Sequence, residues 1–583
     1  MPRSKGASTV TTLDTPVRHF VPQEIDLSDF DQLEPLYREL HERPIATADE
    51  LEKWLLDFSE LSAAVSEYAS RRHIERSCHT DDPEIEKRFL HVVENIQPRV
   101  KPWFFKLQKK YLETGLAEEL AKRDPKYAVL LREWKVEVEI FREENVPLQT
   151  QVTKLNSEYD RLCGQMLVEF EGKTHTLQQM ARYLEEPNRE IRQRAWQTVE
   201  ARRIQDRDAM DGIFDQLMSL RSQIAKNAGM ANYRDYAWKS MGRFDYTPDD
   251  CHRFADAIEQ VCMPLVRKLN AARREQLGLD RLRPWDMAVD VKNRPPLRPF
   301  SPEKVDDMVS GCREIFRRLS PQLAQEFERL QPGRNLDLES RKGKRPGGYQ
   351  ASLAEVKQPF IFMNAAGLHR DVETMLHEGG HAFHYMWASQ EPVLFVQHAP
   401  IEFCEVASMS MELLADPHMD VFYGPDDAAR AVRNHLEGII RFFPWMATID
   451  QFQHWLYTHE GHSRDERTRA WLEIYGRFSD PAIDWSGFEV NREAMWQRQV
   501  HLFHYPFYYV EYGIAQLGAL QMWQQAQRDA QTALANYRKA LSLGGTRPLP
   551  ELFEAAAIRF DFTEKTLRPL IEAIERELDR LPA

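Results

Sequence analysis

The chain has few cysteines, and none of them is spaced as in a zinc finger or a redox motif. Six cysteines occur among 583 residues, and no two of them form a C-x-x-C pair. This pattern fits reduced thiols in a cytoplasmic protein better than a disulfide framework. Long apolar runs are also missing, because no segment approaches the ~20 residues that a membrane helix needs, and no apolar signal sequence follows the N-terminus. We therefore expect a cytoplasmic location and no membrane contact.

Basic residues are in the minority. Lys and Arg number 77 against 91 Asp and Glu, which gives a formal net charge of −14. Such an excess of negative charge repels a phosphate backbone, so nucleic acid is not an expected partner.

Period-two alternation is scarce, whereas apolar residues three and four apart recur along most of the chain. This spacing predicts amphipathic helices and a mainly α fold, and the length of 583 residues predicts more than one lobe. The segment QPGRNLDLESRKGKRPGGY (331–349) is too rich in Gly and Pro for a helix. The apolar run PFIFMN (359–364) that follows is the strongest strand candidate, and the proline at its start suits an edge strand.

Breaks in the helical pattern suggest three segments. Residues 1–26 are expected to form an extended arm, and residues 27–184 an N-terminal helical lobe that ends at the break EEPNRE (185–190). Residues 185–583 then form the larger domain, which carries the motif described next.

Within that domain, His377, Glu378 and His381 spell H-E-x-x-H. Residues four apart on a helix lie one turn apart on the same face, so the two imidazoles can bind one ion at ~2.0–2.1 Å. Glu378 lies beside the metal, where its carboxylate can take a proton from a metal-bound water and pass it to a leaving amine. The motif predicts a metal-dependent hydrolase.

The neighbours of the motif favour a helix that is built for a site. Asp371 suits a helix N-terminal turn, and Glu373, one turn before His377, is placed to orient the second nitrogen of that imidazole. Gly379 and Gly380 each cost a helix about 1 kcal/mol relative to Ala, which is reasonable where another backbone or a substrate approaches closely.

A catalytic zinc usually has three protein ligands, so another segment must supply the third. The next helical stretch, PIEFCEVASMSMELL, offers Glu402, Glu405 and Glu412. Glu405 and Glu412 share a helix face, so that one could bind the metal while the other braces the site. Spacing alone leaves this choice open.

Several stretches resemble the thimet oligopeptidase and oligoendopeptidase F family of zinc metallopeptidases. They are GGYQ (347–350), PFIFMN, DVETMLHEGGHAFH, EVASMSME and HLFHYPFYYVEYGIAQLGAL (501–520). In that family the glutamate that opens the E-V-A-S segment is the third ligand, so the resemblance selects Glu405 and implies one Zn²⁺ per chain. It also implies a mainly α-helical fold of two lobes around a deep substrate channel, with a small β-sheet next to the H-E-x-x-H helix, in which 185–583 is the catalytic domain.

The aromatic segment 501–512 is rich in phenol and imidazole donors, which a purely apolar packing helix does not need. By resemblance, Tyr508, Tyr512 and His501 are candidates for stabilising the oxyanion. Which tyrosine acts is left open, because PFYYVEY departs from the family's usual pattern. The residues expected to contact the substrate are Tyr505, Tyr509, His504, Gly348 and Phe362.

The resulting hypothesis is a zinc-dependent endopeptidase that hydrolyses internal bonds of short oligopeptides. The PFIFMN strand would accept the peptide as an added strand, and Gly347 with Gly348 would form either a moving loop or a plain turn. The alternatives are a dipeptidyl carboxypeptidase of the angiotensin-converting type and a non-catalytic peptide-binding scaffold. Both a monomer and a homodimer remain open.

Overall fold

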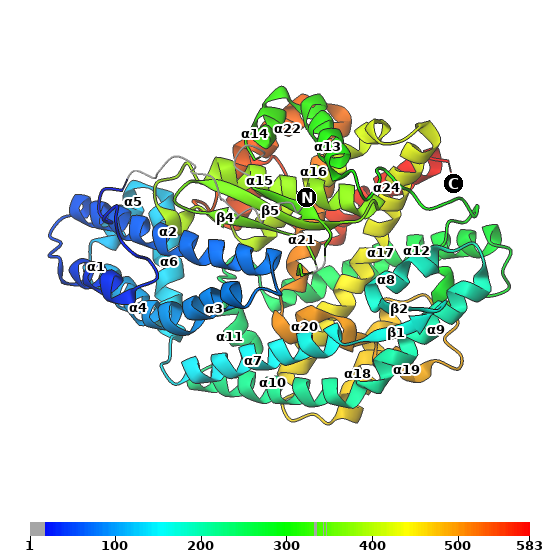
Figure 1. Ribbon diagram of the computed structural model, residues 1–583, viewed down its shortest axis with the longest axis horizontal. Helices are drawn as coiled ribbons and strands as arrows, with labels where there is room; N and C mark the ends of the chain where they lie inside the picture. Colours follow the sequence, from blue (N-terminus) through cyan, green and yellow to red (C-terminus); the bar gives the residue numbers. More distant parts are fainter. Residues whose placement is uncertain (1–17, 331–334, 342, 346, 583) are drawn as a thin grey trace, which may run out of the picture. The chain divides into compact units, whose positions relative to one another are not determined.

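The computed structural model describes residues 18–330, 335–341, 343–345 and 347–582, and most of these residues lie in helices (Figure 1). Their strands form one two-stranded and one three-stranded sheet, which confirms the prediction of a mainly α fold. The chain divides into two compact units of three segments each. The first unit comprises Met1–Val138, Arg298–Ala428 and Gly518–Phe560, and the second comprises Glu139–Leu297, Ala429–Leu517 and Asp561–Ala583. Most of the predicted arm (1–17 of 1–26) lies outside the described residues, and the predicted channel between lobes stays a prediction.

The first unit contains the N-terminal helices, the three-stranded sheet and the H-E-x-x-H helix. Its N-terminal helices are α1 (Phe30–Glu42), α2 (Ala48–Cys78), α3 (Pro83–His91), α4 (Gln97–Glu113), α5 (Ala117–Arg123) and α6 (Pro125–Ile140). Its later helices are α13 (Val305–Leu319), α14 (Pro321–Glu328), α15 (His369–Ala388), α16 (Ile401–Ala415), α22 (Ala530–Leu541) and α23 (Leu549–Ala555).

One hydrophobic core joins the N-terminal helices to a segment far along the chain. The ring of Phe395, between α15 and α16, lies 4.7 Å from Phe58 of α2 and 5.1 Å from Trp134 of α6. Val393 and Val396 are buried in the same core. The predicted boundaries 27–184 and 185–583 therefore do not coincide with the compact units, because residues on both sides of that boundary share one core.

The three-stranded sheet has the order β3-β5-β4, with β3 (Leu336–Glu339) parallel and β4 (Tyr349–Leu353) antiparallel to β5 (Gln358–Ala365). The strand prediction for PFIFMN is confirmed. The prediction that it is an edge strand is wrong, because β5 is hydrogen-bonded on both sides. Its proline pairs with Ser352 at the start of the strand, where a missing N–H is tolerated. β4 is an edge of this sheet, and α15 follows β5 directly and packs against it.

The second unit is helical apart from one hairpin. Its helices include α7 (Asn145–Gly164), α9 (Arg189–Gln205), α10 (Arg207–Asn227), α11 (Tyr233–Ser240), α12 (Pro248–Gln276), α18 (Arg464–Arg477), α20 (Val500–His504) and α24 (Glu564–Arg580). It also contains most of α17 (Pro425–Thr458) and the first part of α21 (Tyr509–Arg528), which continues into the first unit. The hairpin of β1 (Leu167–Phe170) and β2 (Lys173–Thr176) interrupts the helical lobe that the sequence predicted over residues 27–184. Its signal was the Glu171-Gly172 pair, whose positive φ angles of 49° and 74° form a two-residue turn.

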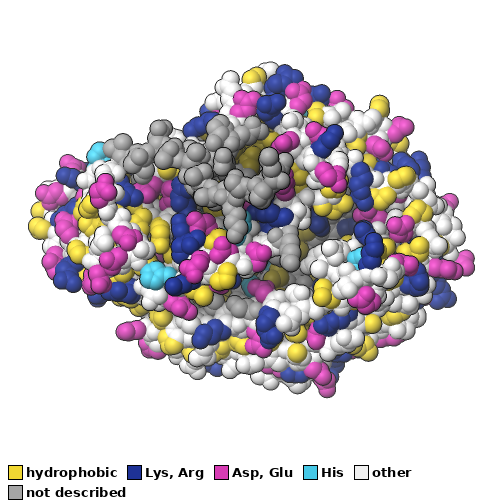
Figure 2. Space-filling view, in the orientation of Figure 1, with side chains coloured by type: hydrophobic (Ala, Val, Ile, Leu, Met, Phe, Trp, Pro, Cys, Tyr) yellow, Lys and Arg dark blue, Asp and Glu magenta, His cyan; other side chains and the backbone are white. Residues whose placement is uncertain are grey.

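None of the helices in the described part of the chain combines the length and the apolar character of a membrane span. On the face drawn in Figure 2, Lys and Arg side chains are interspersed with Asp and Glu side chains. A mixed surface of this kind fits the acidic balance of the sequence and gives no support to a nucleic-acid interface.

Candidate metal and active site

The H-E-x-x-H motif lies on α15, as predicted. The Asp371 carboxylate accepts hydrogen bonds from the backbone N–H of Ala366 (2.7 Å) and of Leu368 (2.8 Å). It thereby ties the end of the sheet to the first turn of the helix, where a negative charge is favourable. The motif follows two turns later, in the middle of the helix.

Gly380 allows α15 to lie against α16. A Cβ atom at this position would stand 2.6 Å from the carbonyl oxygen of Ala407 and 2.7 Å from Cα of Ser408. The expected close backbone approach is therefore present at Gly380. At Gly379 the neighbour is instead a side chain, the ring of Phe316, 2.8 Å from such a Cβ. The close approach brings the carboxylates of α16 to the imidazoles of α15.

Three of the predicted ligands meet in the first unit, and we call His377, His381 and Glu405 the candidate metal site. Glu405 Oε2 lies 3.3 Å from His377 Nε2 and 3.5 Å from His381 Nε2. The two imidazole planes are nearly perpendicular, at 84°. Ser408 Oγ donates a hydrogen bond of 2.8 Å to Glu405 Oε2 and fixes the orientation of that carboxylate.

Glu412, and not Glu373, orients the first imidazole. Glu412 Oε1 lies 2.6 Å from His377 Nδ1, whereas Glu373 forms an ion pair of 3.4 Å with His369 Nε2. The prediction for Glu373 followed spacing along α15 alone. The partner comes from α16, whose glutamates at 405 and 412 share a face and contact the two nitrogens of one imidazole.

The charges of this site are strongly coupled. Burial opposes the charged form of His377, but its hydrogen bonds with Glu405 and Glu412 raise its pKa well above the usual value. Burial likewise opposes ionisation of Glu405, but the neighbouring His381 and His377 hold its pKa far below the usual range. Glu405 is therefore ionised beside two imidazoles. These three groups are a ligand set suited to zinc, which would displace the proton that His377 holds.

Glu378 is buried beside the candidate metal site, with 6% of its surface exposed. Its Oε2 atom has no hydrogen-bond partner within the described part of the chain. Burial raises the pKa of this carboxyl above its ordinary value, although His381 and His377 act in the opposite direction. A carboxylate with a raised pKa and an oxygen that makes no hydrogen bond can accept a proton and return it.

The residues predicted to contact a substrate near the sheet differ in position. Gly348 directly precedes β4 and packs closely under Thr374, 3.2 Å from a would-be Cβ. Asn364 Nδ2 donates a hydrogen bond of 2.9 Å to the carbonyl of Gly347, which favours a structural turn over a moving loop. The side chain of Phe362 is fully buried and stacks on Tyr349 at 4.9 Å, which does not fit the predicted contact with a substrate.

The aromatic segment belongs to the second unit and forms one group of rings. The imidazole of His501 lies 5.9 Å from the ring of Tyr508 and 5.8 Å from that of Tyr512, which are 5.3 Å apart from each other. Tyr505 is exposed, at 58%. Burial raises the pKa of Tyr509 to about 12, and its hydroxyl interacts with Trp445 and Gln499.

His504 is held by a charge in the same unit. Its Nε2 atom forms an ion pair of 3.0 Å with Asp160 of α7, and its ring packs edge-on against Tyr159. These contacts indicate a structural role, in contrast to the predicted contact with a substrate.

Buried arginines that the sequence analysis did not identify fix the aromatic segment. Arg221 donates to the carbonyl of Leu502 at 3.2 Å and also to that of Phe503. Arg243 donates to the carbonyl of Phe507 and to Glu511 Oε1, the latter at 2.7 Å. No sequence signal marks these residues, because their partners are more than 260 positions away.

Comparisons with known proteins agree with the resemblance seen in the sequence. The model of the Peptidase M3 N-terminal domain matches residues 20–141. The chain is 22% identical over 405 residues to oligopeptidase PepF of Bacillus subtilis (strain 168), a match that covers 68% of this chain and 58% of that protein. The chain spans between half and three fifths of the curated relatives that it matches, with 58%, 53% and 52% of their lengths.

Solved structures share the fold over nearly the whole chain. A protein assigned as an oligoendopeptidase F superimposes with a TM-score of 0.88 at 28% identity, covering 96% of this chain and 98% of the other. PZ peptidase A with an inhibitor gives a TM-score of 0.88 at 26% identity and covers 97% of this chain and 98% of the other. Because the model of Peptidase family M3 matches residues 182–571, well over half of the 583 residues, this chain belongs to Peptidase family M3.

Proposed function

We propose that this protein is a zinc-dependent endopeptidase that hydrolyses internal bonds of short oligopeptides. The observation that carries the proposal is the clustering of His377, His381 and Glu405 beside the buried carboxylate of Glu378. Membership of a peptidase family supports the class of reaction. The position of Glu378 beside this cluster also favours a catalytic site over a structural one, because a closed structural metal site needs no neighbouring base.

The residues present fit a zinc ion. Bonds of ~2.0–2.1 Å in tetrahedral geometry place ligand atoms about 3.3–3.4 Å apart. The separations of 3.3 and 3.5 Å between Glu405 Oε2 and the two imidazole nitrogens match this value. We therefore assign His377 Nε2, His381 Nε2 and Glu405 as the ligands of one zinc ion. When bound, zinc supplies Lewis-acid polarisation of a substrate carbonyl and increases the acidity of water.

Glu378 acts as the general base in this proposal. It takes a proton from the water that attacks the carbonyl carbon, and it gives the proton to the amide nitrogen as the C–N bond breaks. Its raised pKa supports both transfers, because a weaker acid is a better proton acceptor and still releases the proton to an amine. Glu412 holds the imidazole of His377 in the ligating orientation.

Two features are proposed to bind the substrate. The edge of β4 replaces β5 as the place where a peptide would add as an extra strand, because β5 is paired on both sides. By resemblance to the family, we also propose that Tyr508, Tyr512 and His501 donate hydrogen bonds to the developing oxyanion. The ring contacts among these three residues support a common function.

The test compares the cleavage of an internally quenched peptide by wild type and by Glu378→Gln. A peptide of about ten residues is suited to a cleft-sized site. We expect equal metal content by mass spectrometry and a loss of at least ~100-fold in kcat/KM for the variant, which is the low end of general-base contributions. Metal bound equally by both proteins without cleavage of any peptide would instead identify a peptide-binding scaffold.

A second substrate separates the rival peptidase class. An endopeptidase cleaves a peptide whose C-terminus is amidated, whereas a dipeptidyl carboxypeptidase requires the free carboxylate. Release of C-terminal dipeptides only, and only from unblocked peptides, would replace the endopeptidase proposal with the angiotensin-converting type.

A further inference from the structure

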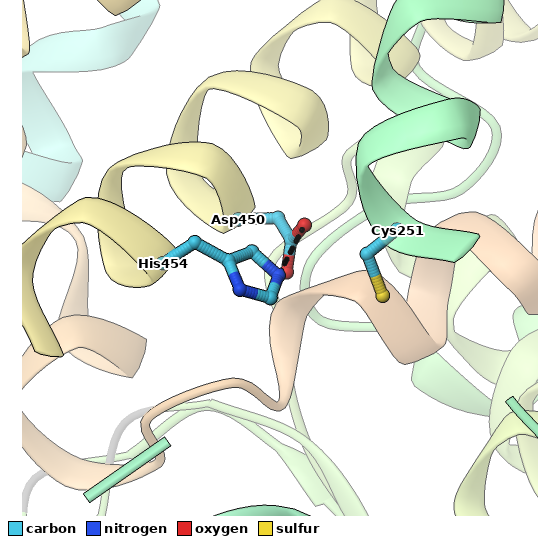
Figure 3. Close-up of side chains that lie close together, drawn as sticks. All are labelled: Cys251, Asp450 and His454. Atoms are coloured by element: carbon cyan, nitrogen blue, oxygen red, sulfur yellow. Dashed lines mark ion pairs between the residues drawn. The ribbon is translucent and has the colours of Figure 1, made fainter. Parts of the chain in front are cut away.

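A second group of possible ligands lies in the second unit, apart from the residues used above. Cys251 is in the first turns of α12, and Asp450 and His454 lie one turn apart on α17. One ligand atom from each of the three residues lies within 4.8 Å of the others. Figure 3 shows the imidazole and the carboxylate projecting from one helix beside the thiol of the other.

The three side chains are almost completely buried, with exposures of 2% for Cys251, 1% for Asp450 and 2% for His454. Buried polar atoms normally have hydrogen-bond partners. Within the described residues, however, Asp450 Oδ1 and both ring nitrogens of His454 have none. His454 Nε2 does form an ion pair of 3.4 Å with Asp450 Oδ2.

Two residues next to this group have their own contact. The ring of Trp238 lies 5.5 Å from that of His454, and Arg243, which stacks on Trp238 at 4.6 Å, forms an ion pair of 2.7 Å with Glu511. A shared proton between Asp450 and His454 would satisfy one atom of each, but it would leave the remaining buried atoms without partners. A cation would satisfy the remaining atoms of both residues together.

We propose that Cys251, Asp450 and His454 form a second metal site that takes a divalent cation of the zinc and cobalt class. A thiolate, a carboxylate and a neutral imidazole are the donors that this class prefers, whereas calcium and magnesium prefer oxygen donors alone. The His454–Asp450 separation of 3.4 Å matches the about 3.3–3.4 Å between zinc ligands, and the remaining pairs, within 4.8 Å, would have to contract by at most about 1.4 Å.

Neighbouring groups orient the proposed ligands. Gln451 Nε2 donates a hydrogen bond of 3.1 Å to Asp450 Oδ2, and Gln451 Oε1 lies 2.6 Å from Nδ1 of His252. The ring of His252 is 4.6 Å from that of His454. The three ligands leave one coordination position for water or for His252.

The buried location indicates a structural role. A site without access to solvent cannot admit a peptide, and it joins two helices whose ligands are 199 positions apart in the sequence, 251 against 450. Metal binding there would hold the start of α12 against α17 and stabilise the second unit.

Cobalt(II) added to the metal-free full-length protein tests the proposal. Thiolate bound to cobalt gives a strong near-ultraviolet charge-transfer band, which nitrogen and oxygen ligands do not give. We expect the wild type to show this band and to bind two cobalt ions per chain. The band should persist in His381→Ala, which removes a ligand from the candidate metal site of the first unit. Absence of the band in the wild type would overturn the proposal without recourse to any variant.

Variants identify the thiol. Cys251→Ala should lose the band and one cobalt equivalent, whereas Cys262→Ala should keep both. Cys262 is the matched control because it lies on the same helix and is equally buried, at 0% exposure. Circular dichroism checks folding, and Cys251→Ser replaces the alanine variant if that variant unfolds. A band of equal strength in folded Cys251→Ala or Cys251→Ser would exclude this site.

Discussion

Gly380→Ala is the substitution that most directly tests how the candidate metal site is assembled. The new Cβ would stand 2.6 Å from the carbonyl oxygen of Ala407, whereas such carbon–oxygen contacts are normally about 3.3 Å or longer. The obstacle is the backbone of α16, which cannot rotate away. The two helices must therefore separate by about 0.7 Å, which is the difference between these two distances.

This separation affects stability less than it affects the site. Overpacking of this kind costs about 1–3 kcal/mol, and the better helix propensity of Ala returns about 1 kcal/mol. The net loss in unfolding free energy is thus about 0–2 kcal/mol. Glu405 moves with α16, however, so its distances to His377 and His381 grow. A misplacement approaching 1 Å is expected to lower kcat/KM by about 10–100-fold and to weaken metal retention against a chelator.

Gly379→Ala is the matched control for this prediction. The substitution is the same and its position is adjacent, but the Cβ there meets the ring of Phe316, at 2.8 Å, and not a backbone. A ring edge can shift without moving α16, so we expect activity and metal retention within a few-fold of wild type. Wild-type activity and metal retention in Gly380→Ala would refute the argument that close helix packing sets the ligand geometry.

Three further changes test other contacts. Glu412→Gln removes the charge that holds the imidazole of His377, and chelator competition should show metal affinity about 10–100-fold weaker; unchanged affinity would contradict the orienting role. Arg243→Met leaves Glu511 as a buried charge without its ion-pair partner, so urea unfolding should show a loss of about 3–5 kcal/mol, most of which the double variant with Glu511→Leu should restore. Glu133 has its pKa raised from 4.5 to about 7, first by burial and then by a neighbouring carboxylate. The folded state therefore binds the proton more tightly than the unfolded state, and stability falls as pH rises from about 4.5 through about 7. This loss in unfolding free energy is up to about 2 kcal/mol after allowance for partial exposure, and Glu133→Gln should abolish it. Parallel profiles of unfolding free energy against pH for the two proteins would exclude this role of Glu133.

The sequence alone determined the local features of the protein. The four-residue spacing of His377 and His381 puts two imidazoles on one helix face wherever that helix lies, and the apolar periodicity required a mainly helical chain. The strand PFIFMN was equally clear, because a short apolar run after a Gly-rich segment has few other solutions. These predictions depend only on residues close together in the sequence, and the spacing of such residues determines their relative positions on a helix or strand.

Only the tertiary structure decided which distant groups meet. Spacing along α15 pointed to Glu373 as the partner of His377. In the structure α16 packs closely against α15 at Gly380, and His377 contacts Glu412 of α16 instead. The position of β5 at the centre of its sheet depended on β3 and β4 lying on either side. The meeting of Cys251 with Asp450 likewise needed two helices far apart in the chain to pack together. Long-range contacts of this kind follow from the total packing of the core, so no local pattern in the sequence specifies them.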